Sequence, residues 1–193
     1  MIVVFEGIPG SGKTSIIEVL AKELGKLGYT CSISNFQNSG PIVNKFILNA
    51  KKHQFGETAR NYDYFLAISH HIMYLKMHMK KNEIILAEDF WGSLPAYAEW
   101  SFVGFDESDP FWDEYPIFFE LETLTFLLDT PVKIAAQKSQ WTKLHDAENA
   151  EKLTKRYHEL AKKHGWERIK FMASLEKRAQ ACLKIILENL SKK

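Results

Sequence analysis

Eight residues near the N-terminus, Gly7-Ile8-Pro9-Gly10-Ser11-Gly12-Lys13-Thr14, match the pattern G-x-x-x-x-G-K-[ST] in full. A short apolar run, Ile2–Phe5, precedes them and predicts a strand, and apolar residues at helical spacing from 13 to 27 predict a helix after them. Glycines let a backbone curl with its N–H groups pointing inward, and a helix N-terminus adds partial positive charge. The segment therefore predicts a loop, a P-loop, that binds the phosphates of a nucleoside triphosphate.

Two side chains of this loop have distinct expected roles, with ATP and Mg²⁺ as the expected cofactors. Lys13 can reach the β and γ phosphates and steady charge during transfer, and the Thr14 hydroxyl can bind Mg²⁺. The alternative is a glycine turn that only links strand to helix, and the Lys-Thr pair directly after Gly12 argues against it. The residues expected to contact the cofactor are Gly7, Pro9, Gly10, Ser11, Gly12, Lys13, Thr14 and Ser15.

Short apolar runs alternate with helical patterns along the rest of the chain. This order predicts parallel β-α-β units and an α/β fold of three layers, with nearly continuous apolar strands covered on both faces by helices. The chain has 193 residues, which suits one domain over 1–193. Further strands are expected at 29–34, 83–87, 124–128 and 166–171, and further helices at 42–52, 57–81, 131–141, 147–163 and 174–190.

The overall charge does not point to a polymer or a membrane as a partner, and a small-molecule acceptor is expected. The formal net charge is +1, so no nucleic-acid or membrane partner is expected, although a local basic patch is compatible with this value. No apolar run approaches the roughly 20 residues of a membrane span. The two cysteines, Cys31 and Cys182, are expected to be reduced thiols, and we expect a cytoplasmic protein.

An acidic pair follows the strand expected at 83–87. Ligands of open α/β sheets gather at the carboxyl ends of the strands, so Glu88 and Asp89 should face the phosphates. We expect Glu88 to be catalytic, holding Mg²⁺ or accepting the acceptor's proton. The alternatives are a solvated acidic turn, which the following Phe90-Trp91 disfavours, and Asp129 as a competing Mg²⁺ ligand at the end of another strand.

Residues 104–122 differ from the rest in composition, with seven acidic residues, no basic ones and many aromatics. The simpler interpretation is a connection whose aromatic side chains reach the core while its acids face water. The other interpretation is a lip over the acceptor site or a surface for a partner.

Several motifs at matching spacing resemble the thymidylate kinase and deoxynucleoside kinase superfamily over most of the chain. They are Phe5-Glu6-Gly7 with the P-loop, Glu88-Asp89-Phe90 with Ser93 and Ala96-Tyr97, Leu127-Leu128-Asp129 with Pro131, and Arg156-Tyr157. The resemblance implies a P-loop NTPase fold with a five-stranded parallel sheet and a lid-like segment near 137–147. It also implies ATP-driven phosphorylation of a nucleoside or nucleotide, and a homodimer through helices such as 57–81.

The chain departs from the family's pattern mainly by losing arginines. Asp89 stands where the family has an arginine, Phe36-Gln37 replace an Arg-Glu pair, and His70 or His71 replaces an arginine of the long helix. Pro9 stands where many relatives have an aspartate. The family's lid carries several arginines, whereas the segment 132–146 has no arginine and three lysines, Lys133, Lys138 and Lys143. Lys138 and Lys143 are the expected lid contacts.

These losses make a weak site for a monophosphate, which carries about two negative charges near neutral pH. Either the acceptor is uncharged, as a nucleoside is, or other basic groups have moved in, with Lys45, Lys51, Lys52 and Arg60 as candidates. The histidines could supply a switchable charge, although one on the helix surface and one packed against a neighbour is the simpler expectation. Gln37 cannot act as a base, which leaves Glu88 for that role.

Aromatic side chains are expected to stack on the acceptor ring, although each is more often plain core. Phe36, Phe65, Trp91, Tyr97 and Trp100 are the candidates. The full set expected to contact the acceptor is Phe36, Gln37, Phe65, His70, Asp89, Trp91 and Tyr97.

Three hypotheses follow from the sequence. The leading one is a kinase, similar to thymidylate kinases, that passes the terminal phosphoryl group of ATP to a nucleoside monophosphate or a nucleoside. The second is a nucleotide-binding regulatory protein without turnover, which the thinned arginines and Gln37 favour. The third is a kinase for another small acceptor, such as an antibiotic hydroxyl.

Overall fold

A five-stranded parallel sheet organises the molecule. The computed structural model describes residues 1–35, 44–45, 48, 56–80, 83–93, 95–97, 122–138 and 147–192. The strands lie in the order β2-β3-β1-β4-β5, which confirms the predicted sheet. They are β1 (Ile2–Glu6), β2 (Thr30–Asn35), β3 (Glu83–Glu88), β4 (Thr123–Asp129) and β5 (Glu167–Lys170).

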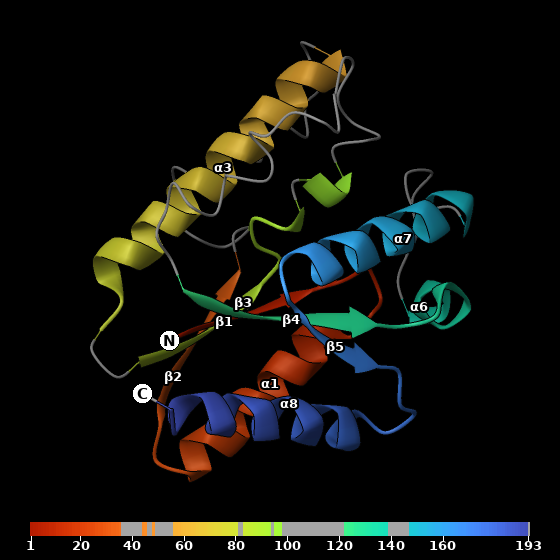
Figure 1. Ribbon diagram of the computed structural model, residues 1–193. Coiled ribbons are helices and arrows are strands. Elements are labelled where there is room, and N and C mark those ends of the chain that lie inside the picture. Colours follow the sequence, from red (N-terminus) through yellow and green to blue (C-terminus); the bar gives the residue numbers. More distant parts are fainter. Residues whose placement is uncertain are drawn as a thin grey trace.

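Helices cover both faces of this sheet, as the three-layer prediction requires (Figure 1). One face carries α1 (Lys13–Lys26) and α8 (Leu175–Leu190), and the other carries α3 (Gly56–His78) and α7 (Ala147–Lys163). The short α6 (Val132–Lys138) begins just after β4 ends. The sheet is therefore enclosed on both sides, which explains why its central strands are almost continuously apolar.

Alternation along β1 divides the buried side chains into two cores. Ile2 and Val4 belong to a cluster with side chains of α3 and α7, whereas Val3 and Phe5 belong to one with side chains of α1 and α8. Successive side chains of a strand point to opposite faces, so an uninterrupted apolar run serves both cores. Every residue of β1 is buried, including Glu6 at its end.

The register of the central strands brings distant residues to one edge. Phe5 lies opposite Glu88 of β3, and Asn35 of β2 lies opposite Glu88 from the other side. Glu6 lies opposite Leu127 of β4. Because all strands run in parallel, the P-loop, the acidic pair after β3 and the end of β4 meet at the same edge.

Most element predictions are confirmed to within a few residues, and α7 matches its predicted range of 147–163. The long helix ends at His78, three residues before the predicted end, and β3 begins at Glu83. Most of the predicted helix 42–52 and residues 104–121 lie outside the described residues. Both cysteines are free, as expected. None of the helices in the described part of the chain has the length and apolarity needed to cross a membrane.

Candidate active site

The P-loop joins β1 to α1 through glycines in conformations that other residues avoid. Gly7, Gly10 and Gly12 have φ values of 144°, 80° and 94°. Two features exclude a side chain at Gly10. Its positive φ disfavours any residue with a Cβ, and a Cβ there would collide with the backbone carbonyl of Ala135 in α6. The Ser11 N–H donates to the Ile8 carbonyl at 3.0 Å and closes the curl. This is the strand–loop–helix arrangement that the motif predicts.

Lys13 lies across the loop in this structure. Its ammonium donates to the Gly7 carbonyl at 2.7 Å and the Ile8 carbonyl at 3.4 Å, and it lies 3.3 Å from Oδ1 of Asp89. Its side chain is only 8% exposed. A buried ammonium needs opposite charge nearby, and here Asp89 supplies it. We expected Asp89 in the acceptor site, and the structure places its carboxylate against the lysine of the phosphate loop.

Thr14 and Glu88, the two residues that the sequence assigns to Mg²⁺, contact each other directly. The Thr14 hydroxyl donates to Oε1 of Glu88 at 2.8 Å, and the Asn35 side-chain amide donates to Oε2 at 3.3 Å. The first turn of α1 and the end of β3 are thus joined through one carboxylate. Carboxylate and hydroxyl oxygens are donors that suit Mg²⁺, so the chemistry of this pair fits the ion.

A buried network beneath the loop was missed in the sequence. Both oxygens of Glu6 accept hydrogen bonds, one from the Phe90 N–H at 3.0 Å and one from the Ser93 hydroxyl at 2.7 Å. Ser93 is also 3.2 Å from the hydroxyl of Tyr157 on α7. Burial and the neighbouring Asp89 raise the pKa of Glu6 to about 8. In the sequence, the signal that could have pointed to Glu6 was an acidic residue between an apolar strand and a glycine-rich loop.

Arg178 of α8 supports the loop from the opposite side and was also missed. It is 3% exposed, and its guanidinium donates to the Ser11 carbonyl at 2.9 Å and to the Thr130 hydroxyl at 3.1 Å. Thr130 in turn donates to the same Ser11 carbonyl at 3.1 Å. In the sequence, the signal that could have pointed to Arg178 was its place beside Ala179 and Cys182, on the apolar face of an amphipathic helix.

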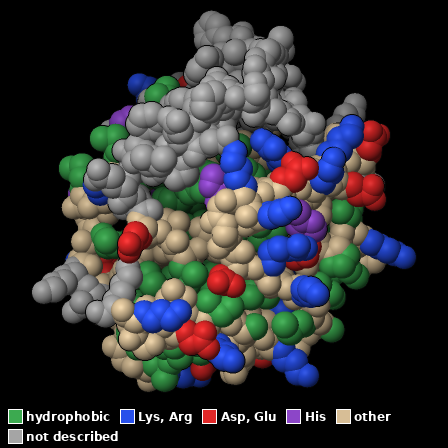
Figure 2. Space-filling model, viewed as in Figure 1, with side chains coloured by type: hydrophobic (Ala, Val, Ile, Leu, Met, Phe, Trp, Pro, Cys, Tyr) green, Lys and Arg blue, Asp and Glu red, His purple; other side chains and the backbone are tan. Residues whose placement is uncertain are grey.

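Asp129, the competing acid, is engaged elsewhere. It accepts from Arg168 at 2.7 Å and lies 2.9 Å from Nε2 of His158. Burial acts to raise the pKa of this carboxyl, but the hydrogen bonds from Arg168 and His158 outweigh it and lower the pKa. Lys and Arg side chains gather over α7 and β5 (Figure 2). The structure therefore gives Asp129 a role in joining β4, β5 and α7.

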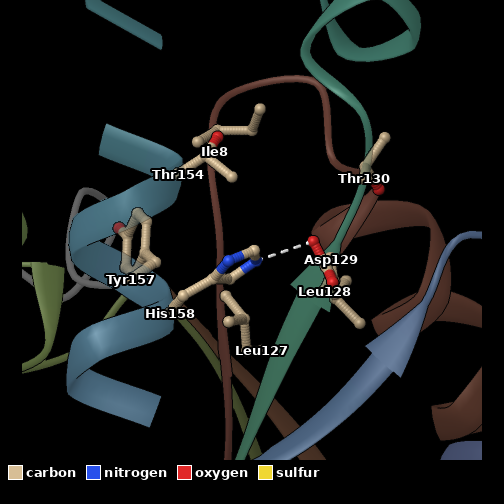
Figure 3. A pocket seen from close by; sticks show the side chains of 8 residues that line it. All are labelled: Ile8, Leu127, Leu128, Asp129, Thr130, Thr154, Tyr157 and His158. Carbon is tan, nitrogen blue, oxygen red and sulfur yellow. Dashed lines mark hydrogen bonds and ion pairs between the residues drawn. The ribbon is translucent and has the colours of Figure 1, made fainter. Parts of the chain in front are cut away.

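A small recess lies beside Asp129 (Figure 3). Figure 3 shows the His158 ring reaching from α7 toward Asp129, with Ile8 of the P-loop at the far side. The recess has room for about one water molecule, so it is too small for a nucleoside. Its lining residues are Ile8, Leu127, Leu128, Asp129, Thr130, Thr154, Tyr157 and His158.

The neighbouring histidines His70 and His71 of α3 differ in burial, in agreement with the simpler expectation. His70 is exposed, whereas His71 is 1% exposed, with Nε2 3.3 Å from the Ser34 hydroxyl and its ring edge against Phe90. Burial lowers the pKa of His71 to about 4, so this ring is neutral near pH 7. The structure thus turns His71, and not His70, toward the ends of β2 and β3.

The expected aromatic contacts are only partly described. Trp91 is 6% exposed and packs edge-on against Trp166 and His164, which places its ring in the core, whereas Tyr97 is half-buried beside that core. Lys138 ends α6 with its ammonium 5.7 Å from the Phe171 ring. The side chains of Phe36, Gln37, Phe65 and Lys143 lie outside the described residues.

A solved structure has the same fold. The thymidylate kinase of Candida albicans superposes with a TM-score of 0.77, at 14% sequence identity, over 100% of this chain and 93% of that one. At this identity the likeness concerns the fold alone.

Sequence comparison is more specific. A curated thymidylate kinase from Geotalea uraniireducens is 25% identical over 142 residues, which cover 71% of this chain and 66% of that protein. The chain therefore spans slightly less than two thirds of the length of this relative. The family model described as thymidylate kinase matches residues 5–181, from the end of β1 into α8. With the P-loop, the acidic pair after β3 and this match over most of its length, the chain belongs to the thymidylate kinase family.

Proposed function

We propose that this protein transfers the terminal phosphoryl group of ATP to a small acceptor, in the first place a nucleoside monophosphate. One observation carries the proposal. Two consecutive P-loop side chains each contact one of two consecutive acids at the end of β3, with Lys13 3.3 Å from Asp89 and Thr14 2.8 Å from Glu88. Lysine, hydroxyl and carboxylate are the groups that phosphoryl transfer uses to position phosphates and compensate their charge.

The residues of this cluster have separate proposed roles. The Lys13 ammonium leaves Asp89 and the loop carbonyls for the β and γ phosphates, because a triphosphate offers more negative charge than one carboxylate. Thr14 and Glu88 hold Mg²⁺, which when bound compensates charge on the phosphates. Glu88 also accepts the acceptor's proton, since Gln37 has no basic group. Asp89 lies close enough to orient Lys13 or to share the proton.

The acceptor is either a monophosphate or an uncharged nucleoside. The family favours the monophosphate, and the names of both relatives specify thymidylate. Asp89 and the neutral, buried His71 favour an uncharged hydroxyl, because neither supplies positive charge at the end of β3. The Candida albicans enzyme is described as having broad substrate specificity, which supports testing a wide range of acceptors.

The test is a panel of acceptors with labelled ATP and Mg²⁺. We expect transfer to at least one member of a set containing thymidine monophosphate, the other nucleoside monophosphates and the corresponding nucleosides. Lys13→Ala should lose this transfer, and Lys26→Ala should keep it, because the Lys26 side chain is 71% exposed on the same helix. ATP binding by calorimetry without transfer to any acceptor would instead support a regulatory nucleotide-binding protein.

We also propose a homodimer through α3. Four side chains along this helix are large, apolar and 40–75% exposed, namely Leu66, Met73, Tyr74 and Met77. Exposed apolar surface concentrated on one helix is typical of interfaces. Light scattering should give twice the chain mass, and Met77→Glu should shift it toward the monomer. The control Lys184→Glu changes charge on α8, on the other side of the sheet, and should leave the dimer intact. A monomeric wild type at high concentration contradicts the dimer.

A further inference from the structure

Asp89 has a backbone conformation that needs support. It is the one residue other than glycine with a positive φ, 52°, in the part of the chain that the structure describes. A side chain in the left-handed region is strained, and such residues persist where their surroundings hold them. The conformation directs the Asp89 carboxylate to within 3.3 Å of the Lys13 ammonium.

The last two residues of β1 hold this turn. The Asp89 N–H donates to the Phe5 carbonyl at 3.2 Å, and the next N–H, of Phe90, donates to the Glu6 carboxyl at 3.0 Å. The second of these bonds has a side-chain acceptor, the Glu6 carboxyl, because the backbone pairing between β1 and β3 has ended at this point. Glu6 is 0% exposed, so without it the Phe90 N–H would be buried next to apolar side chains with no acceptor in its place.

The second oxygen of Glu6 extends the same support. Ser93 donates to it at 2.7 Å, and the Ser93 N–H donates to the Phe90 carbonyl at 3.1 Å, so the turn is bonded at both ends. The contact between Ser93 and Tyr157 at 3.2 Å continues to α7. Glycine at 92 makes room for the arrangement, because a Cβ there would lie 2.9 Å from Oε1 of Glu6.

We propose that Glu6 is a positioning residue that holds Asp89 in the left-handed conformation in which its carboxylate faces Lys13, and that Ser93 links this support to Tyr157 of α7. Glu6 acts through the turn and not on the phosphates themselves. The kinase readout below rests on the proposed function, whereas the amide-exchange readout does not.

The first experiment measures hydrogen exchange of single amides by NMR in the full chain without ligand. Glu6→Met has similar length but no acceptor, and we expect exchange of the Phe90 amide to accelerate by at least about tenfold. Glu6→Gln retains a carbonyl for Phe90 and an amide for Ser93 and should stay within about threefold of the wild type. The amide of Leu86, inside β3, serves as the reference for global opening.

The outcomes are separable. Acceleration at Phe90 with an unchanged Leu86 supports the proposal, and unchanged exchange at Phe90 overturns it. Equal acceleration at both amides also overturns it, because it would show a contribution to general stability alone. If Glu6→Met does not fold, Ser93→Ala is measured instead. It removes the hydrogen bond to the second oxygen of the Glu6 carboxyl, so the Phe90 amide should exchange faster, and unchanged exchange overturns the proposal.

The second experiment uses turnover with the best acceptor of the panel. We expect Glu6→Met to lower kcat by about 100-fold with KM for ATP within about threefold, and Glu6→Gln to restore most of the rate. If Glu6 acts through Asp89, Glu6→Met should add little to Asp89→Asn in the double variant. Fully multiplicative losses overturn the proposal. A wild type without turnover contradicts the kinase function only, and the exchange data still decide the role of Glu6.

Discussion

Lys13 has two kinds of partner in this structure, backbone carbonyls of the loop and the carboxylate of Asp89. A ligand phosphate competes with both for the ammonium. Lys13→Ala should therefore lower the transfer rate by about two to three orders of magnitude or more, as removal of one charge-stabilising donor does in other enzymes. Steady-state turnover measures it, and a rate close to that of the wild type would contradict the phosphate assignment.

The two acids at the end of β3 differ in their partners, and this difference predicts an order of effects. Glu88 joins Thr14 to Asn35, whereas the carboxylate of Asp89 faces Lys13. Glu88→Gln should therefore cost more in kcat than Asp89→Asn, because Glu88 has the proposed base and Mg²⁺ roles. The reverse order would transfer these roles to Asp89, and two small losses would remove both acids from the mechanism.

The positions of site residues were predictable where the motif is local in sequence. Lys13 and Thr14 follow one another, and the acid pair directly follows an apolar strand, so each could be placed without the fold. Glu6, Ser93 and Tyr157 are separated by 87 and 64 positions along the chain, and only the parallel register brings them together. The motifs that contain these residues could be recognised, but the contacts between them could not be read from the sequence, and the same holds for the contact of Arg178 with Ser11.

At the scale of elements, α8 supports the P-loop through a single buried side chain. Arg178→Met should weaken binding of ATP with Mg²⁺, because the Ser11 carbonyl and the Thr130 hydroxyl both lose their guanidinium partner. The unfolding free energy should fall by about 1–3 kcal/mol, the usual effect of losing buried hydrogen bonds to a charged group. Calorimetry and urea unfolding measure the two effects.

The neighbouring Lys177→Met is the matched control for this variant, since that side chain is exposed on the same turn of α8. It should change neither quantity beyond about 0.5 kcal/mol. Wild-type ATP affinity in Arg178→Met would show that the loop keeps its shape without α8.

Hydrophobic periodicity predicted the elements well because most of their stability comes from burying one face. The range of α7 was correct since apolar residues such as Leu153, Tyr157 and Leu160 recur at helical spacing up to Ala161. The end of α3 was placed too late because exposed methionines continue the apolar pattern toward Met79, although the chain has already left the helix. Periodicity does not distinguish a core face from an exposed apolar one.

For the molecule as a whole, Glu6 predicts a pH dependence of stability. Its folded pKa of about 8 lies above the ordinary 4.5, so between these values the native state binds more protons than the unfolded state. The contribution of Glu6 to stability is therefore greatest below pH 4.5 and is lost as pH rises through 8, by up to about 1.4 kcal/mol per pH unit. Relative to Glu6→Gln, the wild type should lose unfolding free energy from about pH 5.5 to about pH 8.5.

Urea unfolding of both proteins across this range provides the measurement. Glu18→Gln, at an exposed position of α1, should run parallel to the wild type at every pH. Parallel curves for Glu6→Gln as well would mean that the Glu6 carboxyl is already ionised in the native state.

Because Gly10 packs closely against α6, the two sides of the phosphate loop differ in how much they can move. On the α6 side the loop meets the main chain of Ala135 with no space for even one methyl group. On the β3 side it meets Asp89 through the ammonium of Lys13, which is carried on a flexible four-carbon stem. An entering triphosphate is therefore bounded by closely packed main chain on the α6 side and by a flexible side chain on the β3 side. We expect adjustment to ligands of different size to take place on the β3 side, which carries the acids.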